Sequence, residues 1–231
     1  MLHARRLAVA AAAVALAAPL HAQSLFEGVV TFTMKGKTDT HPDTMVQTSK
    51  GSKVKLEIRG GRNGGGYVVY DLTTRMMMMV MNDQKQYMSM PMPTPPAETQ
   101  RTVKDIKITR TGRHETVAGV SCEVITSTWG DQSGNVKEGG GCFAKGVGLE
   151  FPDLYNAGAK GSSGNAELDA FRDLQKEGLR IVKAWSVDKN NQQSMFEAVK
   201  IERKSVDGST FDPPAGYKQL QMPAMPKGMK P

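Results

Sequence analysis

The 231-residue chain has a formal net charge of +7, 24 glycines, 15 methionines and two cysteines. Its basic residues are scattered and are not interleaved with aromatic residues, which argues against binding to nucleic acid. Scattered charge of this kind predicts a solvated sheet face, and contact with an anionic membrane surface is the alternative.

The first 22 residues have the features of a secretory signal peptide. A basic start (MLHARR) precedes an apolar run over residues 7–20, and cleavage is expected after Ala22. The run is too short and too rich in alanine for a membrane-spanning helix. Removal of residues 1–22 takes away Arg5 and Arg6 and leaves 209 residues with a net charge of +5. We expect a periplasmic or secreted protein with a single β-rich domain over residues 23–218.

Most of the mature chain alternates apolar with polar residues, as strands of a half-buried antiparallel sheet do. The clearest case is KVKLEIR (residues 53–59), in which Val54, Leu56 and Ile58 face one way and the charged residues face the other. Further strands are predicted over residues 26–34, 67–71, 76–81, 86–90, 106–111, 119–129, 136–143, 179–187 and 195–203. The pattern therefore predicts a mainly β (α+β) protein.

One helix of about eleven residues is expected before Gly178, which would follow its last turn. Ser163 or Asn165 can cap its start, and its apolar stripe is formed by Leu168, Phe171 and Leu174. The tail over residues 219–231 has no packing pattern and is predicted to be disordered.

Cys122 and Cys142 are predicted to form a disulfide, because an exported chain enters an oxidising compartment. Their midpoint is Gln132, inside the turn-like segment GDQSGN. A hairpin centred there would place the two cysteines directly opposite each other on paired strands.

Motifs of known enzyme sites are missing from the sequence. The mature chain has two histidines, His41 and His114, and neither has a metal-ligand spacing. G-x-S-x-G and the P-loop are absent. SKVK (residues 52–55) matches S-x-x-K but begins a strand, and GGGCFAKG resembles a degenerate dinucleotide fingerprint without a following helix. The sequence therefore predicts a non-enzymatic protein without a cofactor.

The segment MMMMVMNDQKQYMSMPM (residues 76–92) contains eight methionines among 17 residues. It predicts a hairpin that turns at residues 82–85 and ends at a run of prolines. Three interpretations stay open. The methionines can fill a core, line an adaptable pocket for an apolar ligand, or bind Cu(I) through thioethers. The predicted Cu(I) ligands are Met88, Met90 and Met92, with further methionines in the tail at Met222, Met225 and Met229.

An ordered set of short motifs resembles a family of bacterial secreted proteins that carry domain of unknown function 4412. The motifs are a strand ending in Asp71, the Met-rich hairpin with Lys85 and Tyr87 on its return strand, VAGVSC (residues 117–122) and PAGY (residues 214–217). Val120 stands where an aromatic residue is usual. The resemblance covers nearly the whole mature chain.

The family is similar to the periplasmic lipoprotein-carrier (LolA/LolB-like) architecture. That resemblance implies a curved antiparallel sheet, or half barrel, with one principal helix packed against it and an apolar cavity between them. The leading hypothesis is an exported binding protein for an apolar or lipid-like ligand. A structural or envelope-assembly protein without a small ligand is an alternative. The candidate lining residues are Met77, Met79, Met81, Tyr87, Met88, Met90, Phe171 and Trp185.

Overall fold

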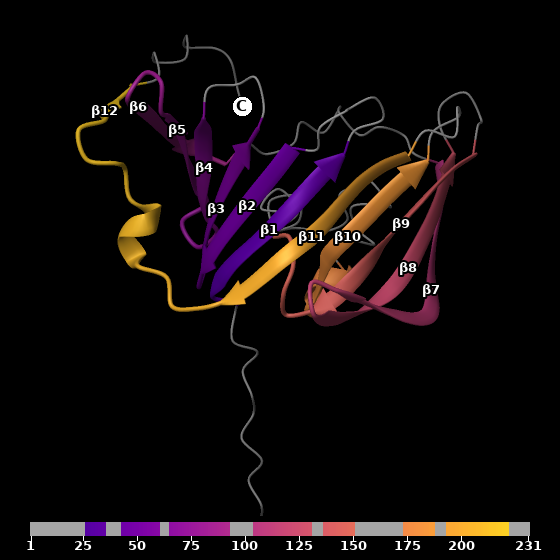
Figure 1. Ribbon diagram of the computed structural model, residues 1–231. Coiled ribbons are helices and arrows are strands. Elements are labelled where there is room, and N and C mark those ends of the chain that lie inside the picture. Colours follow the sequence, from indigo (N-terminus) through magenta and orange to yellow (C-terminus); the bar gives the residue numbers. More distant parts are fainter. Residues whose placement is uncertain are drawn as a thin grey trace, which may run out of the picture.

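The computed structural model describes residues 26–35, 43–60, 65–92, 104–130, 136–150, 173–187 and 193–221. They form one 12-stranded sheet with the strand order β12-β6-β5-β4-β3-β2-β1-β11-β10-β9-β8-β7 (Figure 1). Neighbouring strands pair antiparallel, except that β12 pairs with β6 in parallel. A mostly β protein built on a large open sheet is therefore confirmed.

The strands of the N-terminal half lie side by side in chain order. They are β1 (Gly28–Lys35), β2 (Asp43–Lys50), β3 (Lys53–Arg59), β4 (Gly66–Asp71), β5 (Met76–Met81) and β6 (Gln86–Pro91). The C-terminal strands continue the sheet from β1 in reverse order and add one short strand at the far edge. They are β7 (Lys104–Val117), β8 (Val120–Gly130), β9 (Val136–Lys145), β10 (Leu179–Val187), β11 (Gln193–Arg203) and β12 (Lys218–Gln219).

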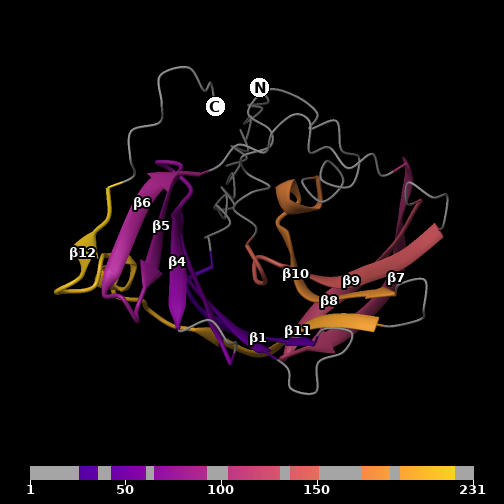
Figure 2. The same ribbon diagram turned by 90° about the horizontal axis from the view of Figure 1, so that it is seen from above.

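The sheet bends into a trough, with β4 to β6 in one wall and β7 to β9 in the other (Figure 2). Its pairing is irregular between Thr31 and Phe32 of β1, where β11 carries an extra residue, and between Ile181 and Lys183 of β10. Such bulges bend strands and increase their twist, so they contribute to the curvature. The predicted curved sheet is thus observed, and its inner surface is called the concave face below.

Strand β2 was not predicted from the sequence, because a polar residue occupies a core position in it. The Gln47 side chain is fully buried. Its Nε2 donates to Ser49 Oγ at 3.2 Å and to the Gly148 carbonyl at 3.0 Å, and its Oε1 accepts from the Glu150 N–H at 2.9 Å. A buried amide satisfied in this way costs little, but it hides the alternation that marks the other strands.

Strand β7 is longer than predicted, because an irregularity interrupts it without ending it. The predicted strand covered residues 106–111, whereas β7 runs to Val117. The pairing with β8 shifts between Arg110 and His114, and Gly112 has a φ of 69° there. A bulge on an outermost strand also discourages pairing with another chain.

The disulfide between Cys122 and Cys142 is present, with 5.3 Å between their Cα atoms. The predicted pairing was wrong in detail, because the cysteines are not directly opposite. Cys122 pairs with Ala144, and Cys142 pairs with Val124. The hairpin is centred one residue later than expected, so the bridge joins diagonal neighbours on one face.

The predicted helix is not supported as a principal element packed on the sheet. Most of it, Phe171 included, lies outside the described residues, and the described part is one helical turn over residues 173–176. Leu174 of that turn is buried with Ile125, Phe143 and Ile181. The turn ends as predicted at Gly178, which has a φ of 80° and whose N–H donates to the Gln175 carbonyl at 2.9 Å.

A segment after β11, residues 204–217, crosses the convex face and is called the strap. It contains the 3-10 turn η2 (Gly208–Phe211), which lies outside the wall formed by β4 to β6 (Figure 1). Glu27 holds its start, since its Oε1 accepts from the Val206 N–H at 2.8 Å and lies 3.4 Å from Lys50 Nζ. The Asp207 side chain caps η2 by accepting from the Ser209 N–H at 2.9 Å.

Acid is expected to loosen the strap. The hydrogen bond from the Val206 N–H lowers the pKa of Glu27, and that from the Ser209 N–H lowers the pKa of Asp207. Both carboxylates therefore stabilise the strap above their unfolded pKa values of about 4, and this contribution is lost as the pH falls through the lower folded values. Amide NMR shifts of Val206 and Ser209 should titrate in that acidic range. Glu27→Gln should remove the titration of Val206 alone, and shifts that stay flat in the wild type would contradict the assignment.

Candidate functional site

A hollow of about 620 Å³ lies on the concave face and is bordered by β1 to β5. It is called the concave hollow. Most of its lining is apolar. The lining residues are Met34, Asp43, Met45, Leu56, Ile58, Gly66, Tyr67, Val68, Tyr70, Met79, Val80, Met81, Asn82, Asp83 and Gln84.

The strand register explains why the sheet is hollowed at this point. One row of inward-facing side chains runs across the strands from Gln47 through Leu56 and Val68 to Met79. The adjacent row begins at Met45 and Ile58 and ends at Met81, which pairs with Gly66. Gly66 has no side chain, so this row has a gap beside Met81.

Glycine is required at position 66 because β4 and β5 approach closely there. A Cβ atom on Gly66 would lie 2.6 Å from the Val80 carbonyl oxygen. That separation is too short for a non-bonded contact, so any side chain would push the two strands apart. The close approach and the gap in the row therefore have the same cause.

Ile58 shows that the concave hollow is not filled by the described residues. Its side chain is 51% exposed, although its strand neighbour Val54 on the same face is 1% exposed. Leu56, Val68 and Met79 around it are half-buried. An exposed aliphatic side chain at the centre of an apolar lining is typical of an interaction surface.

The mouth of the concave hollow is polar. It is formed by Asp43 and by Asn82, Asp83 and Gln84 of the β5–β6 turn. Asn82 is fixed, since its Nδ2 donates to the Gly65 carbonyl and its Oδ1 accepts from the Tyr217 hydroxyl at 3.1 Å. No basic residue occurs among the described lining residues, so the mouth has acidic character.

The convex face of the same hairpin is closed. Met78 and Val80 are buried there against Val206 and Phe211 of the strap. Tyr87 also packs against this cluster, and its hydroxyl lies 3.4 Å from Gln219 Oε1. A cavity of about 230 Å³ remains between β5 and η2, and Met76, Met78 and Phe211 are among the residues that border it. The two faces of β5 are therefore unequal, with a covered convex side and an open concave side.

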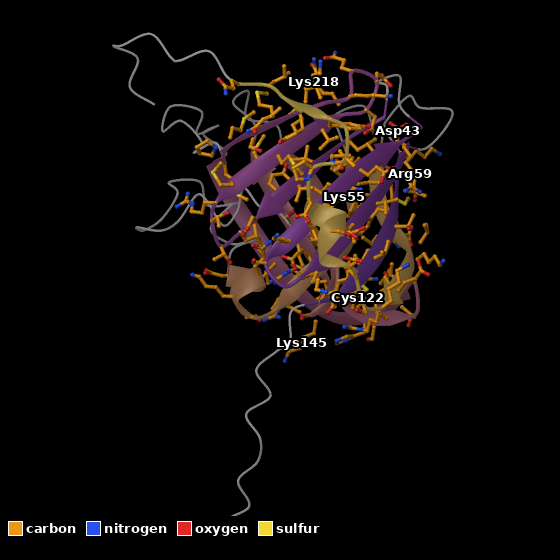
Figure 3. All side chains as sticks on the ribbon, turned by 90° about the vertical axis from the view of Figure 1, so that its left-hand side faces the viewer. Asp43, Lys55, Arg59, Cys122, Lys145 and Lys218 are labelled. Atoms are coloured by element: carbon orange, nitrogen blue, oxygen red, sulfur yellow. A yellow bond between two sulfur atoms is a disulfide. The ribbon has the colours of Figure 1, made fainter. Side chains whose placement is uncertain are left out.

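Charged residues of β3 lie on the convex face, as the sequence predicted. Lys55 Nζ lies 3.8 Å from the centre of the Tyr67 ring, and burial is the main cause that lowers the pKa of Lys55. Arg59 is paired with Glu57 at 2.9 Å. Figure 3 shows Lys55 beside the strap on this outer face, with Asp43 and Arg59 near one end of the strands.

A second concave cavity, of about 230 Å³, lies in the other half of the sheet beneath Leu174. Trp185 lines it and pairs with Gly140 of β9. A Cβ on Gly140 would lie 2.6 Å from the Trp185 ring, and one on Gly141 would lie 2.9 Å from the Lys183 carbonyl. The glycine run that resembled a dinucleotide fingerprint is therefore strand that makes room for Trp185.

The structure separates the predicted lining residues into five groups. Met79 and Met81 border the concave hollow. Met77, Met88 and Met90 share their face, since Met88 pairs with Met79 and Met90 pairs with Met77, but they do not border the concave hollow. Tyr87 lies on the convex face, and Trp185 lines the second cavity. Phe171 lies outside the described residues.

Much of the concave hollow was missed by the sequence prediction, which concentrated on methionine-rich segments. The missed apolar residues are Met34, Met45, Leu56, Ile58, Tyr67, Val68, Tyr70 and Val80. The alternation in KVKLEIR carried the signal for Leu56 and Ile58, since it marked one apolar face of that strand. YVVYD is apolar on both faces and did not single out Val68 and Tyr70. Met45 lies on the strand that was not predicted.

No group of three or more His, Cys, Asp or Glu side chains is placed to hold a metal ion in the part of the chain that the structure describes. No helix within that part has the length and apolar character needed to cross a membrane.

Comparison with curated proteins gives no match. Comparison with solved structures gives 33 matching chains. They include an uncharacterized conserved protein from Thermus thermophilus, with 8% identity over 84% of this chain and 90% of that chain at a TM-score of 0.45. PNGF-II matches with 11% identity over 85% of this chain and 31% of that chain at a TM-score of 0.40. MucB matches with 13% identity over 82% of this chain and 58% of that chain at a TM-score of 0.44.

At these scores the likenesses say nothing about what the chain binds. The family comparison covers far more than half of the chain. Residues 26–217 match the family described as Domain of unknown function (DUF4412), and the chain therefore belongs to that family.

Proposed function

We propose that this chain is an exported, non-enzymatic binding protein whose concave hollow takes an apolar or lipid-like molecule. The observation that carries the proposal is the uncovered apolar lining around Ile58, on a sheet whose other face is closed by the strap. Export rests on the signal-peptide features of residues 1–22, and a disulfide fits an oxidising compartment.

The size and lining of the concave hollow suit such a ligand. A volume of about 620 Å³ falls within the range of small-molecule pockets, about 300 to 1,000 Å³. Met34, Met45, Met79 and Met81 give the lining flexible, polarisable side chains that adapt to different apolar shapes. Asp43 and Asp83 at the mouth would repel a carboxylate and attract a cation. We infer that the ligand has an uncharged or cationic head on an apolar body.

Ile58→Glu is expected to weaken the binding of phenylnaphthylamine, an uncharged probe that fluoresces in apolar surroundings, by at least tenfold. A carboxylate at the centre of the lining would have to be desolvated, which costs more than the roughly 1.4 kcal/mol that corresponds to a tenfold change. Ile58 is half exposed, so the variant should fold. Fluorescence titration of purified protein gives the affinity, and thermal unfolding checks the fold.

The matched control is Val199→Glu. Val199 is an aliphatic residue with 53% exposure, close to the 51% of Ile58, and it borders none of the cavities described above. Its variant should bind the probe like the wild type. In competition, a long-chain trimethylammonium amphiphile should displace the probe better than a fatty acid of the same length. Equal losses in both variants, or no binding by the wild type, would reject the proposal and favour an envelope-assembly protein without a small ligand.

A further inference from the structure

Four methionines form a rectangle on the concave face of the β5–β6 hairpin. Met79 pairs directly with Met88, and Met77 pairs directly with Met90. Alternation along each strand places all four side chains on one side of the sheet. All four are half-buried, so solvent reaches them. This group is called the thioether rectangle.

The spacing of the thioether rectangle allows its sulfur atoms to converge. Directly opposite residues of an antiparallel pair have Cβ atoms about 5 Å apart, and residues two apart on a strand are separated by about 7 Å. The centre of such a rectangle lies about 4 Å from each Cβ. A thioether sulfur is two bonds beyond Cβ on a side chain with three rotatable bonds, so it can turn toward that centre.

We propose that the thioether rectangle binds a soft monovalent cation, Cu(I). Thioethers are soft, uncharged ligands that select Cu(I) over the hard cations that prefer oxygen. The ligands come from two strands held in fixed register, so the site needs no rearrangement of the backbone. Binding is of Cu(I) as such, and no change in the oxidation state of the metal is involved.

This ligand set differs from the one predicted from the sequence, which was Met88, Met90 and Met92 along one strand. Met92 lies beyond the end of β6, is 5% exposed, and its N–H donates to the Arg75 carbonyl at 2.9 Å. Its side chain is therefore less available to a metal ion. Pairing across the strands brings in Met77 and Met79 instead.

The proposal is independent of apolar binding in the concave hollow, although Met79 takes part in both. Substitution of methionine by leucine keeps an apolar side chain of similar volume but removes the sulfur ligand. A variant with leucine at positions 77, 88 and 90 spares Met79 and borders no part of the concave hollow, so it should lose Cu(I) and keep the apolar probe. Ile58→Glu should do the reverse, so the failure of either proposal can be recognised separately.

Competition against a chromogenic Cu(I) chelator, under anaerobic reducing conditions, tests the site. The wild type should bind one Cu(I), and the Met79→Leu/Met88→Leu variant should bind at least about tenfold more weakly. The triple leucine variant should lose this binding. The matched control is Met76→Leu/Met78→Leu on the opposite face of the same hairpin, which should stay within about twofold of the wild type.

A second measurement locates the metal. Protein labelled with ¹³C at the methionine methyl groups is titrated with Ag(I), an air-stable analogue of Cu(I). The signals of Met77, Met79, Met88 and Met90 should shift, whereas those of Met76 and Met78 should not. Undiminished Cu(I) affinity in the triple leucine variant, no affinity in the wild type, or shifts confined to Met222, Met225 and Met229 of the tail would each overturn the proposal.

Discussion

Replacing Arg180 with methionine is expected to lower the free energy of unfolding by about 3 to 5 kcal/mol. The Arg180 side chain is 10% exposed, and its Nε donates to Glu150 Oε1 at 2.9 Å. Its Nη1 donates to the carbonyls of Gln175 at 2.9 Å and Leu179 at 3.0 Å. Methionine would leave the Glu150 carboxylate, itself only 13% exposed, without the guanidinium that faces it.

Denaturant unfolding should be compared for Arg180→Met and Arg110→Met. The comparison separates the cost of leaving Glu150 without its buried partner from the cost of losing any arginine. Arg110 forms ion pairs with Glu123 and Glu177 at 3.0 Å, but its side chain is 46% exposed. Exposed pairs contribute about 0 to 1 kcal/mol, so Arg110→Met should cost much less. Adding Glu150→Gln to Arg180→Met should recover part of the loss, because the buried charge disappears. Equal costs for the two arginine variants would refute the role given to Arg180.

The polar contacts around Glu150 connect strands that are far apart in the sheet. Gln47 on β2 accepts from the Glu150 N–H, and Arg180 on β10 holds the Glu150 carboxylate. Between β2 and β10 in the strand order lie β1 and β11. Glu150 therefore ties both sides of the base of the trough together across its concave face. Such a tie limits how far the open sheet can flatten, and the concave hollow depends on that curvature.

The strands could be predicted where one face is buried and the other is solvated. The alternation in KVKLEIR predicted the bounds of β3. The bounds of β5 and β10 were predicted because each is an apolar run between clear turns. The same rule failed at β2, where Gln47 takes a core position through long-range hydrogen bonds to Gly148 and Glu150. Contacts over a hundred residues away leave no local pattern.

The candidate site was predicted in part for similar reasons. Side chains alternate between the two faces of a strand, so the sequence correctly separated Met76 and Met78 from the other methionines of β5, which are Met77, Met79 and Met81. Alternation alone could not show which of the two faces the strap would cover. That outcome depends on Val206 and Phe211 of the strap, which follow far later in the chain.

The gap at Gly66 was also invisible in the sequence, because it arises from register across several strands. The segment GGRNGGG (residues 60–66) is as typical of a flexible turn as of the start of a strand, and only its last glycine, Gly66, belongs to β4. The disulfide was predicted because an exported chain enters an oxidising compartment and because the chain has two cysteines. Its diagonal geometry was not, because a shift of one residue in the hairpin centre changes every pairing.

Removing the disulfide by Cys122→Ala/Cys142→Ala is expected to lower the free energy of unfolding by about 3 kcal/mol. The bridge closes a loop with a sequence separation of 20, and the chain-entropy model gives a stabilisation of that size for such a loop. Both sulfurs lie in the core, with Cys122 2% and Cys142 0% exposed, so some packing is lost as well.

Denaturant unfolding with and without a thiol reductant measures this contribution. Reductant should move the unfolding midpoint of the wild type toward that of the double-alanine variant and leave the variant unchanged. Because the bridge joins β8 to β9, in the wall opposite β4 to β6, native protein of the variant should still bind the apolar probe in the concave hollow. Two alkylated cysteines in unreduced, denatured wild type, or a midpoint insensitive to reductant, would show that the bridge does not hold this wall.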